Sequence, residues 1–338
     1  MSSPNVAVIG ATGAVGQVAL QILEERAFPM NSLRLCASSN SVGRKIEFQG
    51  QQIEIELPTE ELFSDTDIAF IAVGSSLSKI YGPLAVSQGC TVIDKSAAFR
   101  MDPAVPLVVP EINGSDILSH QGIISVPNCS TTQMVMALYP LHQVNPIKRV
   151  VVDTYQSVSG TGKAAMAELQ DQTNQILNGL PIKPEAYPHQ IAFNALPQVE
   201  TFLEDGYTTE ERKMRDETRK IFHSDLIQIS ATCVRVPVPI SHSEALHIEF
   251  ERPMQPAEAR TLLDSFPGVT VIDDSFSSLY PLAADASGHD DVFVGRIRSD
   301  DSHPNGLAMW VVSDNLRKGA ATNGVQIAEE LIRLTNKE

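Results

Sequence analysis

A short apolar segment followed by closely spaced glycines constrains the fold of this chain more than any other feature. "NVAVIG" (5–10) has the apolar, β-branched character of a buried strand, and "GATGAVG" (10–16) follows it directly. The residues after it have a helical period, with apolar side chains on roughly one face: Val15, Val18, Ile22 and Leu23. Gly10, Gly13 and Gly16 permit a tight turn and a close approach of the main chain to a ligand. The spacing is GxxGxxG rather than the commoner GxGxxG, but the free N–H groups at the helix start would bind a pyrophosphate in the same way.

Strand-like and helix-like segments alternate after this turn. Further strands are predicted at 33–38, 67–74 and 91–96, with a helix near 77–88. Such alternation is typical of a mostly parallel sheet with helices on both faces. The first part of the chain is therefore predicted to be a Rossmann-type nucleotide-binding domain in an α/β protein.

The end of the second predicted strand indicates which nicotinamide cofactor would fit. Sites that prefer NAD usually place Asp or Glu there, on the ribose 2′-hydroxyl. Here the strand ends in "CASSNSVGRK", and no acid occurs before Glu47. The polar side chains instead suit a 2′-phosphate, with Arg44 or Lys45 adding charge: Ser38, Ser39 and Asn40. The sequence predicts NADP.

Composition excludes several classes of protein. The 338 residues suffice for two domains, and 43% hydrophobic with 20% charged residues is ordinary for a globular enzyme. The net charge of −16 disfavours nucleic acid and anionic membranes as partners, so an anionic substrate would need a local basic site. No apolar run reaches the roughly 18 residues of a membrane span, and "MSSPNVAVIGATG" does not read as a signal peptide. Four scattered cysteines without a CxxC pair favour a reducing cytoplasm over a disulfide framework or a metal site.

The regular alternation of predicted strands and helices ends near residue 129, which indicates a second domain. A helix is predicted at 163–177, with Gly179 after its end. A strand that ends in a small-residue loop is predicted within 149–160, two strands are predicted within 231–251, and further strands at 268–273, 292–300 and 307–314. We expect an inserted α+β domain for catalysis and dimerisation at 129–315. The dinucleotide-binding domain would then comprise 1–128 plus 316–338, with a last helix at about 316–335 that packs back on it.

"VPNCSTTQ" (126–133) places Cys129 at the start of a predicted apolar helix. There the helix dipole would lower the pKa of the thiol and favour the nucleophilic thiolate. A buried structural cysteine is the alternative interpretation. His242 lies in a polar bend between two predicted strands, Gln156 ends a strand and Arg235 lies within one. Taken singly, each of these three is better explained by a structural role.

Taken together, the motifs resemble one family. "GATGAVG" (10–16), "PNCSTTQ" (127–133), "TYQSVSG" (154–160), "RVPV…HSE" (235–244) and "DNLRKGAA" (314–321) are similar to the signature blocks of bacterial aspartate-semialdehyde dehydrogenases. They occur in the same order and at similar spacing, so the resemblance covers essentially the whole chain. One position departs from the pattern: Lys95 stands where asparagine is more usual.

The resemblance implies a role for particular residues. Cys129 would be the nucleophile, His242 the acid and base, and Gln156 would orient the acyl intermediate. The substrate would be held at its carboxylate, amino and phosphate groups by Arg235, Glu210, Arg100, Lys213 and Asn128. The cofactor would be lined by the glycine turn, the polar segment after the second strand and two later loops: Gly10, Thr12, Gly13, Ala14, Val15, Gly16, Ser38, Ser39, Asn40, Ser159, Gly160 and Asn315.

The implied activity is the NADPH-dependent reduction of L-aspartyl-4-phosphate to L-aspartate 4-semialdehyde with release of phosphate. It belongs to the biosynthesis of lysine, diaminopimelate, methionine and threonine. The residue types suit this chemistry, because a thiolate can displace phosphate to form a thioester that accepts hydride, while a histidine transfers the proton. Arginine forks match carboxylate geometry, which answers the need for local basic groups in an acidic protein.

Three alternatives remain at this stage. N-acetyl-γ-glutamyl-phosphate reductase shares the plan, but its cysteine block usually reads "NPGCYPT". Glyceraldehyde-3-phosphate dehydrogenase has a similar "CTT" but orders its motifs differently. A non-catalytic paralogue that serves as a binding subunit should have lost the thiol or the histidine, and this chain has both.

A homodimer is the expected assembly. "RVPVPI" and "ALHIEFE" alternate in polarity, and "LAMWVVSD" contains Trp310. A sheet that is apolar on both faces needs both faces covered, and two-fold pairing is the commonest way to cover the second. A monomer in which the helix at 163–177 covers that face is the alternative.

Overall fold

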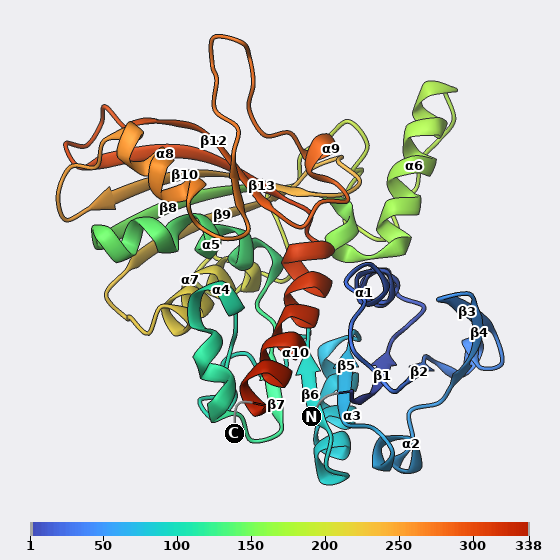
Figure 1. The fold of residues 1–338 in the computed structure, drawn as a ribbon. Coiled ribbons are helices and arrows are strands. Elements are labelled where there is room, and N and C mark those ends of the chain that lie inside the picture. The colour runs from blue at the N-terminus through green and yellow to red at the C-terminus, as the bar shows by residue number, and fades with distance from the viewer. Residues whose placement is uncertain (1–2, 337–338) are drawn as a thin grey trace. The chain divides into compact units, whose positions relative to one another are not determined.

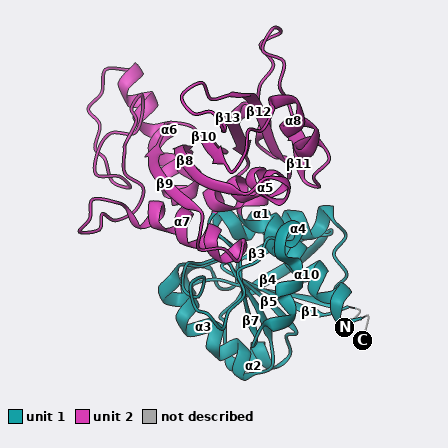
Figure 2. Cartoon of the chain, turned by 90° about the vertical axis from the view of Figure 1, so that its left-hand side faces the viewer, with its two compact units in different colours: residues 1–128, 320–338 teal, residues 129–319 magenta. Residues whose placement is uncertain are grey.

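The computed structural model of the protein describes residues 3–336. The chain forms two compact units, one comprising 1–128 and 320–338 and the other 129–319 (Figure 2). Each unit contains its own sheet, and the order of the elements along the chain can be followed by colour in Figure 1.

The first unit contains a seven-stranded sheet in the order β3-β4-β2-β1-β5-β6-β7. Its strands are β1 (Asn5–Ile9), β2 (Ser32–Cys36), β3 (Lys45–Phe48), β4 (Gln51–Glu56), β5 (Ile68–Ile71), β6 (Thr91–Asp94) and β7 (Ile123–Ser125). Every neighbouring pair is parallel except the β3–β4 hairpin. The helical elements are α1 (Ala14–Glu25), η1 (Ser39–Ser41), α2 (Glu60–Ser64), α3 (Ser75–Ser87), α4 (Pro110–Asn113), η2 (Gly114–Ser119) and α10 (Thr322–Thr335).

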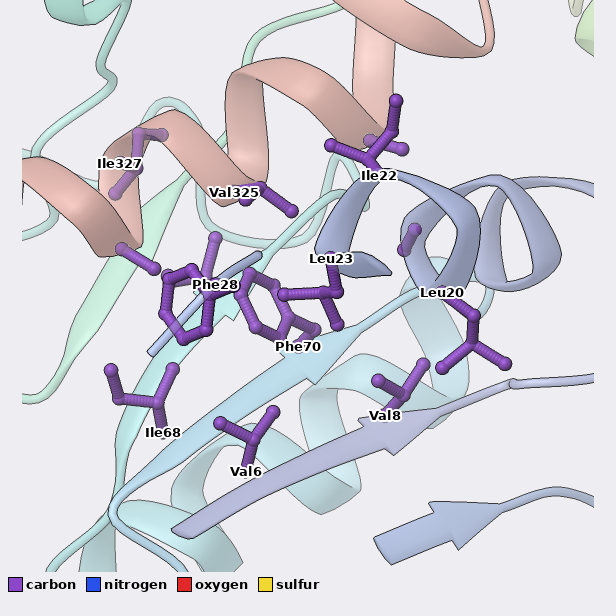
Figure 3. Close-up of a cluster of buried hydrophobic side chains, with 14 of the residues drawn as sticks. Val6, Val8, Leu20, Ile22, Leu23, Phe28, Ile68, Phe70, Val325 and Ile327 are labelled. Carbon is purple, nitrogen blue, oxygen red and sulfur yellow. The ribbon is translucent and has the colours of Figure 1, made fainter. Parts of the chain in front are cut away.

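Helices cover both faces of this sheet. On one face, α1 and α10 pack over β1 and β5, and Figure 3 shows Leu23 and Val325 meeting above Phe70. On the other face, Leu62, Phe63 and Ala85 pack against alternate residues of the same strands. The prediction of an α/β protein with a Rossmann-type parallel sheet is confirmed.

The β3–β4 hairpin was not predicted from the sequence. Its strands read "KIEF" and "QQIEIE", with too few apolar residues to register as strands. The hairpin turn is encoded by Gln49 and Gly50, both with positive φ, as a two-residue primed turn requires. The strands lie at the edge of the sheet, where polar residues discourage pairing with another chain.

The second unit contains a six-stranded mixed sheet in the order β11-β12-β13-β10-β8-β9. Its strands are β8 (Ile147–Gln156), β9 (Gln228–Arg235), β10 (His242–Phe250), β11 (Val269–Val271), β12 (Val292–Ser299) and β13 (Gly306–Ser313). The helical elements are α5 (Cys129–Val144), η3 (Val158–Thr161), α6 (Lys163–Leu177), α7 (Thr209–Ile221), α8 (Pro256–Asp264), α9 (Ala283–Ala286) and a π-helical turn η4 (Arg317–Ala321) at the boundary between the units.

One face of this sheet is covered by helices. α5 packs against β8, β12 and β13, while α7 contacts β9 and α8 contacts β11 and β12. On the covered face the strands place alternate apolar residues, and the cross-strand row Val152, Leu246 and Met309 is almost fully buried. α6 instead packs through Ala165 and Leu169 into a separate small cluster. The predicted strand ends and the helix at 163–177 agree closely with the observed elements.

The predicted final helix is present, and its first turn is π-helical. A π-helical turn occupies Arg317–Ala321 before α10 begins at Thr322. Gly319 lies within this turn, and a Cβ placed on it would come within 2.9 Å of Cys129 Cβ. The irregular turn therefore brings main chain, without a side chain, against the cysteine. π-helical turns often occur at functional sites for this kind of reason.

Candidate functional site

The glycine turn of the first unit has the geometry that a nucleotide site needs. Gly10 has φ +91°, and a Cβ there would lie 2.6 Å from the Ala72 carbonyl oxygen. A Cβ on Gly16 would lie 2.2 Å from the Gly10 oxygen, so α1 packs on the turn more closely than any side chain allows. Thr12 and Gly13 complete the turn, and α1 begins at Ala14 with no side-chain cap at its N-terminus. This cradle fits a pyrophosphate bound by the first N–H groups of α1.

The segment after β2 carries accessible polar groups. Ser38, Ser39 and Asn40 are exposed, and Arg44 and Lys45 are exposed a few residues later. The segment between β2 and β3 contains no acidic residue. It can therefore donate hydrogen bonds to an anion without a carboxylate to repel it.

Arg100 and Asn128, both expected at the substrate, are buried in the first unit. Arg100 donates from Nε to the Val126 carbonyl (2.9 Å) and from Nη2 to the Lys95 carbonyl (2.7 Å). The contact made by Lys95 uses its main chain, so any residue at that position could make it. The departure from the family pattern at Lys95 leaves this support of Arg100 intact.

Cys129 and His242 lie together in the second unit. Cys129 is the first residue of α5, and its Sγ is 3.3 Å from Nε2 of His242, the first residue of β10. His242 is fully buried, whereas Cys129 is partly exposed. The thiol therefore has both a helix N-terminus and an imidazole beside it, the two features that favour a thiolate.

The other three cysteines are unsuited to this role. All are buried free thiols. Burial raises the pKa of Cys36 to about 12 and that of Cys90 to about 11, with nearby acidic groups adding to both shifts. Burial likewise raises the pKa of Cys233. These residues behave as small apolar groups, which leaves Cys129 as the candidate nucleophile.

Arg235 lies at the end of β9 with a donor available. Its Nη1 donates to the Ser157 carbonyl (2.7 Å), while its buried Nε has no hydrogen-bond partner among residues 3–336. A Cβ on Gly160 would lie 2.9 Å from Arg235 Nη1 and 3.3 Å from His242 Nε2. Gly160 therefore keeps the space beside both groups open.

A second polar group joins β8 to α7. Gln156 Nε2 donates to Glu210 Oε1 (3.2 Å), and Lys213 Nζ contacts Glu210 Oε2 (3.3 Å) as well as Glu200. Glu210 is buried in the first turn of α7, a helix that begins with a Thr208–Glu211 capping box. The charged helix α7 thus contributes Glu210 and Lys213 to a polar cluster that is largely buried.

Asn315 is the centre of a third group. Its Oδ1 accepts from the Ser241 N–H (2.9 Å) and from the hydroxyls of Ser157 and Ser159 (3.1 Å each). Ser159 and Asn315, both expected at the cofactor, are therefore held together. Ser157 connects this group to His242 through its N–H and Oγ, each 3.0 Å from Nδ1.

Neither Ser157 nor Gly319 was predicted from the sequence to be a functional residue. Both lie inside motifs that resemble the family's signature blocks, "TYQSVSG" and "DNLRKGAA". Only the three-dimensional contacts distinguish them from their neighbours. Among the residues that the structure describes, no cluster of potential metal ligands occurs, and no helix is long and apolar enough to cross a membrane.

Comparison with known proteins agrees with this geometry. Residues 5–120 match the family model "Semialdehyde dehydrogenase, NAD binding domain", and residues 138–318 match "Semialdehyde dehydrogenase, dimerisation domain". The aspartate-semialdehyde dehydrogenase of Legionella pneumophila is 52% identical over 97% of this chain and 96% of its own length. That of Bacillus subtilis is 50% identical over 98% of each chain.

A solved structure is similar over the same length. The crystal structure of aspartate semialdehyde dehydrogenase II complexed with ASA from Vibrio cholerae has a TM-score of 0.96 and 44% sequence identity. The similarity covers 98% of this chain and 99% of the chain in that crystal structure. Full-length identity of about half, both family models and this shared fold lead to one conclusion. The chain belongs to the aspartate-semialdehyde dehydrogenase family.

Proposed function

We propose that this protein reduces L-aspartyl-4-phosphate to L-aspartate 4-semialdehyde with NADPH and releases phosphate, in the biosynthesis of lysine, diaminopimelate, methionine and threonine. The observation that carries the proposal is the Cys129 Sγ–His242 Nε2 contact of 3.3 Å at the start of α5. The names of the relatives, and the aspartate semialdehyde complex among the similar structures, support the substrate.

In the first half of the reaction, the Cys129 thiolate attacks the acyl carbon of the acyl phosphate. The carbon–sulfur bond forms, the carbon–oxygen bond to phosphate breaks, and phosphate leaves with the bonding electrons. Gln156, at the end of β8, is proposed to donate a hydrogen bond to the acyl oxygen. The product is a thioester on Cys129, which is a better hydride acceptor than a carboxylate.

In the second half, the thioester is reduced to the aldehyde. The nicotinamide cofactor supplies the hydride when it is bound. His242 holds a proton at Nε2, at the position facing Cys129, and gives it to the oxyanion that forms as hydride adds to the thioester carbon. The imidazole takes this proton back as the carbon–sulfur bond breaks, so that the free aldehyde leaves and Cys129 returns as a thiolate. Burial of His242 keeps bulk water away from the proton that it transfers.

Different polar and charged residues are proposed to bind different groups of the substrate. Arg235, with an unpartnered and buried Nε, is proposed to bind the α-carboxylate. Glu210 is proposed to bind the amino group. Arg100 and Lys213 are proposed to bind phosphate, with Asn128 beside the substrate. Each assigned residue carries the charge or hydrogen-bonding group opposite to that of its proposed partner.

The glycine turn supports a nicotinamide dinucleotide, and the segment after β2 supports NADP over NAD. Gly10, Gly13 and Gly16 permit the close approach of a pyrophosphate, with Thr12, Ala14 and Val15 lining the same turn. Ser38, Ser39 and Asn40 are proposed to bind the 2′-phosphate. Ser159, Gly160 and Asn315 are proposed to contact the nicotinamide end. The domain roles follow: 1–128 plus 316–338 for the dinucleotide, and 129–315 for catalysis and pairing.

We also propose a homodimer formed through the second unit. The sheet face opposite α5 carries the row Asp153, Ala245 and Trp310, and Tyr155 stacks at a tilt on Trp310 with ring centroids 5.3 Å apart. Tyr155 is 41% exposed although it lies in a central strand. An aromatic surface of this kind, in a unit that matches a dimerisation domain, suits a second copy of the chain. The free cysteines support the cytoplasm as its compartment.

A coupled assay tests the proposed substrate. Aspartate semialdehyde, NADP and inorganic phosphate should generate NADPH, and omission of phosphate should stop turnover after the enzyme has been acylated. N-acetylglutamate semialdehyde serves as the matched competitor. Equal or faster turnover of the acetylated substrate would assign the chain to the related reductase activity instead.

A further inference from the structure

The imidazole of His242 has a different partner on each nitrogen. Nε2 faces Cys129 Sγ at 3.3 Å. Nδ1 faces Ser157, whose main-chain N–H donates to it at 3.0 Å and whose Oγ lies at the same distance. Ser157 is fully buried and has no role in the mechanism given above. Two groups of one residue therefore compete for a single nitrogen of the acid–base histidine.

The two groups of Ser157 suit different protonation states. A main-chain N–H can only donate, so Nδ1 must present its lone pair to it. A neutral imidazole in that state carries its proton on Nε2, toward Cys129. When Nδ1 carries a proton, the main-chain bond is lost and an acceptor is needed. Ser157 Oγ is the acceptor that the structure places there.

Asn315 prepares the Ser157 hydroxyl for this role. The Ser241 N–H donates to Asn315 Oδ1 at 2.9 Å, which fixes the orientation of the amide. Ser157 Oγ can then donate its own proton to Oδ1 at 3.1 Å. The Ser159 hydroxyl, which accepts from Asn315 Nδ2, lies 3.0 Å from Ser157 Oγ and can donate to one of its lone pairs, which leaves the other for Nδ1–H. Ser241 has φ +75°, an uncommon value for serine, directly before His242. The bond to Asn315 anchors this unusual main chain.

Ser157 also holds the arginine. Its carbonyl accepts from Arg235 Nη1 at 2.7 Å. The main chain of one residue thus fixes both His242 and the proposed carboxylate-binding group. Replacement of the side chain alone leaves these two main-chain bonds in place, which separates the hydroxyl from the rest of the residue.

We propose that Ser157 is a positioning residue that sets the tautomer and charge of His242: its N–H holds the resting imidazole with the proton on Nε2, and its Asn315-bound hydroxyl accepts Nδ1–H whenever the imidazole is charged. The inference rests on the proposed function, in which His242 transfers a proton. Only an imidazole with Nδ1–H can give up its Nε2 proton and remain neutral. The proton moves from Nε2 to the oxyanion left by hydride addition and returns to Nε2 as the carbon–sulfur bond breaks, and the proton transfer itself oxidises or reduces nothing.

The titratable and charged groups around His242 come from several elements. They are Cys129 in α5, Arg235 in β9, Glu244 on the histidine's own strand, Asp314 after β13, and the Glu210–Lys213 pair in α7. None of them changes in Ser157→Ala. A difference between that variant and the wild type therefore reports the hydroxyl.

The test is a pH titration of the ligand-free enzyme, labelled with ¹⁵N in its histidine rings and followed by NMR. His242→Asn identifies the signals of His242. In the wild type at high pH, the proton should be on Nε2. In Ser157→Ala the high-pH tautomer should be the same, because the N–H remains, but the midpoint should fall by about one pH unit because the charged ring loses its acceptor. Ser157→Thr should restore the midpoint, and Ser87→Ala, at an exposed serine of α3 whose hydroxyl bonds only within its own helix turn, should not move it.

Kinetics add an independent readout. Ser157→Ala should lower kcat about tenfold, a fraction of the usual acid–base contribution, with little change in KM because Arg235 keeps its main-chain partner. A wild-type Nδ1–H tautomer at high pH, or an unchanged midpoint in Ser157→Ala, would overturn the proposal. The titration needs no substrate, so this outcome is distinct from failure of the proposed activity.

Discussion

At the scale of single residues, the site depends on groups whose surroundings change their chemistry. Cys129 and Cys90 are both thiols, but Cys90 donates to two main-chain carbonyls in an apolar cluster, and burial raises its pKa to about 11. Cys129 lies at a helix start beside His242. The sequence could separate the two cysteines because the predicted helix begins at Cys129. It could not supply the imidazole partner, which is 113 residues away in the chain.

His242→Ala should lower kcat by about 10²–10⁴, the usual contribution of a positioned acid–base group. The Cys129 side chain stays in place, but no group then holds a proton for the aldehyde oxygen. Steady-state kinetics of phosphate-dependent NADP reduction measure the effect. His303→Ala, in the loop between β12 and β13, is the matched histidine control and should keep the wild-type rate. A rate near wild type in His242→Ala would return this histidine to a structural role.

Glu244 is a fully buried carboxyl beside the amide of Gln133. Burial raises its pKa well above the ordinary value; a hydrogen bond from Gln133 opposes this shift and the charge of Glu210 adds to it. The folded protein therefore binds this proton more tightly than the unfolded chain. Its contribution to stability is fully present below the ordinary pKa of about 4.5 and is lost as pH rises toward the folded value.

Glu244→Gln should therefore become more stable relative to the wild type as pH rises. Each pH unit between the unfolded and folded pKa values costs the wild type about 1.4 kcal/mol that the variant does not lose. Urea unfolding at fixed protein concentration, from pH 5 to pH 9, measures the difference. Parallel curves for the two proteins would mean that Glu244 is ionised in the folded state.

At the scale of elements, periodicity predicted those segments that bury one face. β1, α1, β5 and α6 follow apolar patterns, and their predicted positions agree with the structure. The short polar hairpin β3–β4 was missed because its strands lie at an edge and bury little. The π-helical geometry of η4 was not predicted, because it accompanies a distant contact, the approach of Gly319 to Cys129, which no local pattern encodes.

The segment after β2 should determine the choice of cofactor. We expect kcat/KM for NADP to exceed that for NAD by about tenfold or more, because Ser38, Ser39 and Asn40 can bind a phosphate and no carboxylate repels it. Ser38→Asp should reverse the preference by repelling the 2′-phosphate while offering an acceptor to a ribose hydroxyl. Equal use of both cofactors by the wild type would show that this segment does not contact the adenosine ribose.

At the scale of the whole molecule, the sequence predicted an insertion of one unit into another, and the structure divides the chain at residues 128 and 320. The acidic chain, with a net charge of −16, groups Arg235 and Lys213 with buried polar side chains rather than spreading them over the surface. The sheet face of the second unit that carries Tyr155 and Trp310 could be anticipated only as alternating polarity. Tyr155 and Trp310 lie together on this face because of the strand register, which no local pattern in the sequence fixes.

The homodimer should dissociate when this face is charged. Ala245→Arg places a long cation between Asp153 and Trp310 in the centre of the sheet, where it would be buried in the proposed interface. Sedimentation over a micromolar range should give twice the chain mass of 36.7 kDa for the wild type and the single mass for the variant. Ser87→Arg, on an exposed position of α3, controls for added charge. A wild-type protein that is active as a monomer would contradict the proposed homodimer.

The most direct test of the central claim is to isolate the acyl-enzyme. The protein is incubated with aspartate semialdehyde and NADP without phosphate, quenched in acid, and digested for mass spectrometry. The account predicts one aspartyl group per chain on the peptide that contains Cys129, released when phosphate is added before the quench, and none in Cys129→Ser, since an alcohol here lacks the nucleophilicity of the thiolate. An unmodified Cys129 in protein that is turning over substrate, or the same adduct in Cys129→Ser, would contradict it.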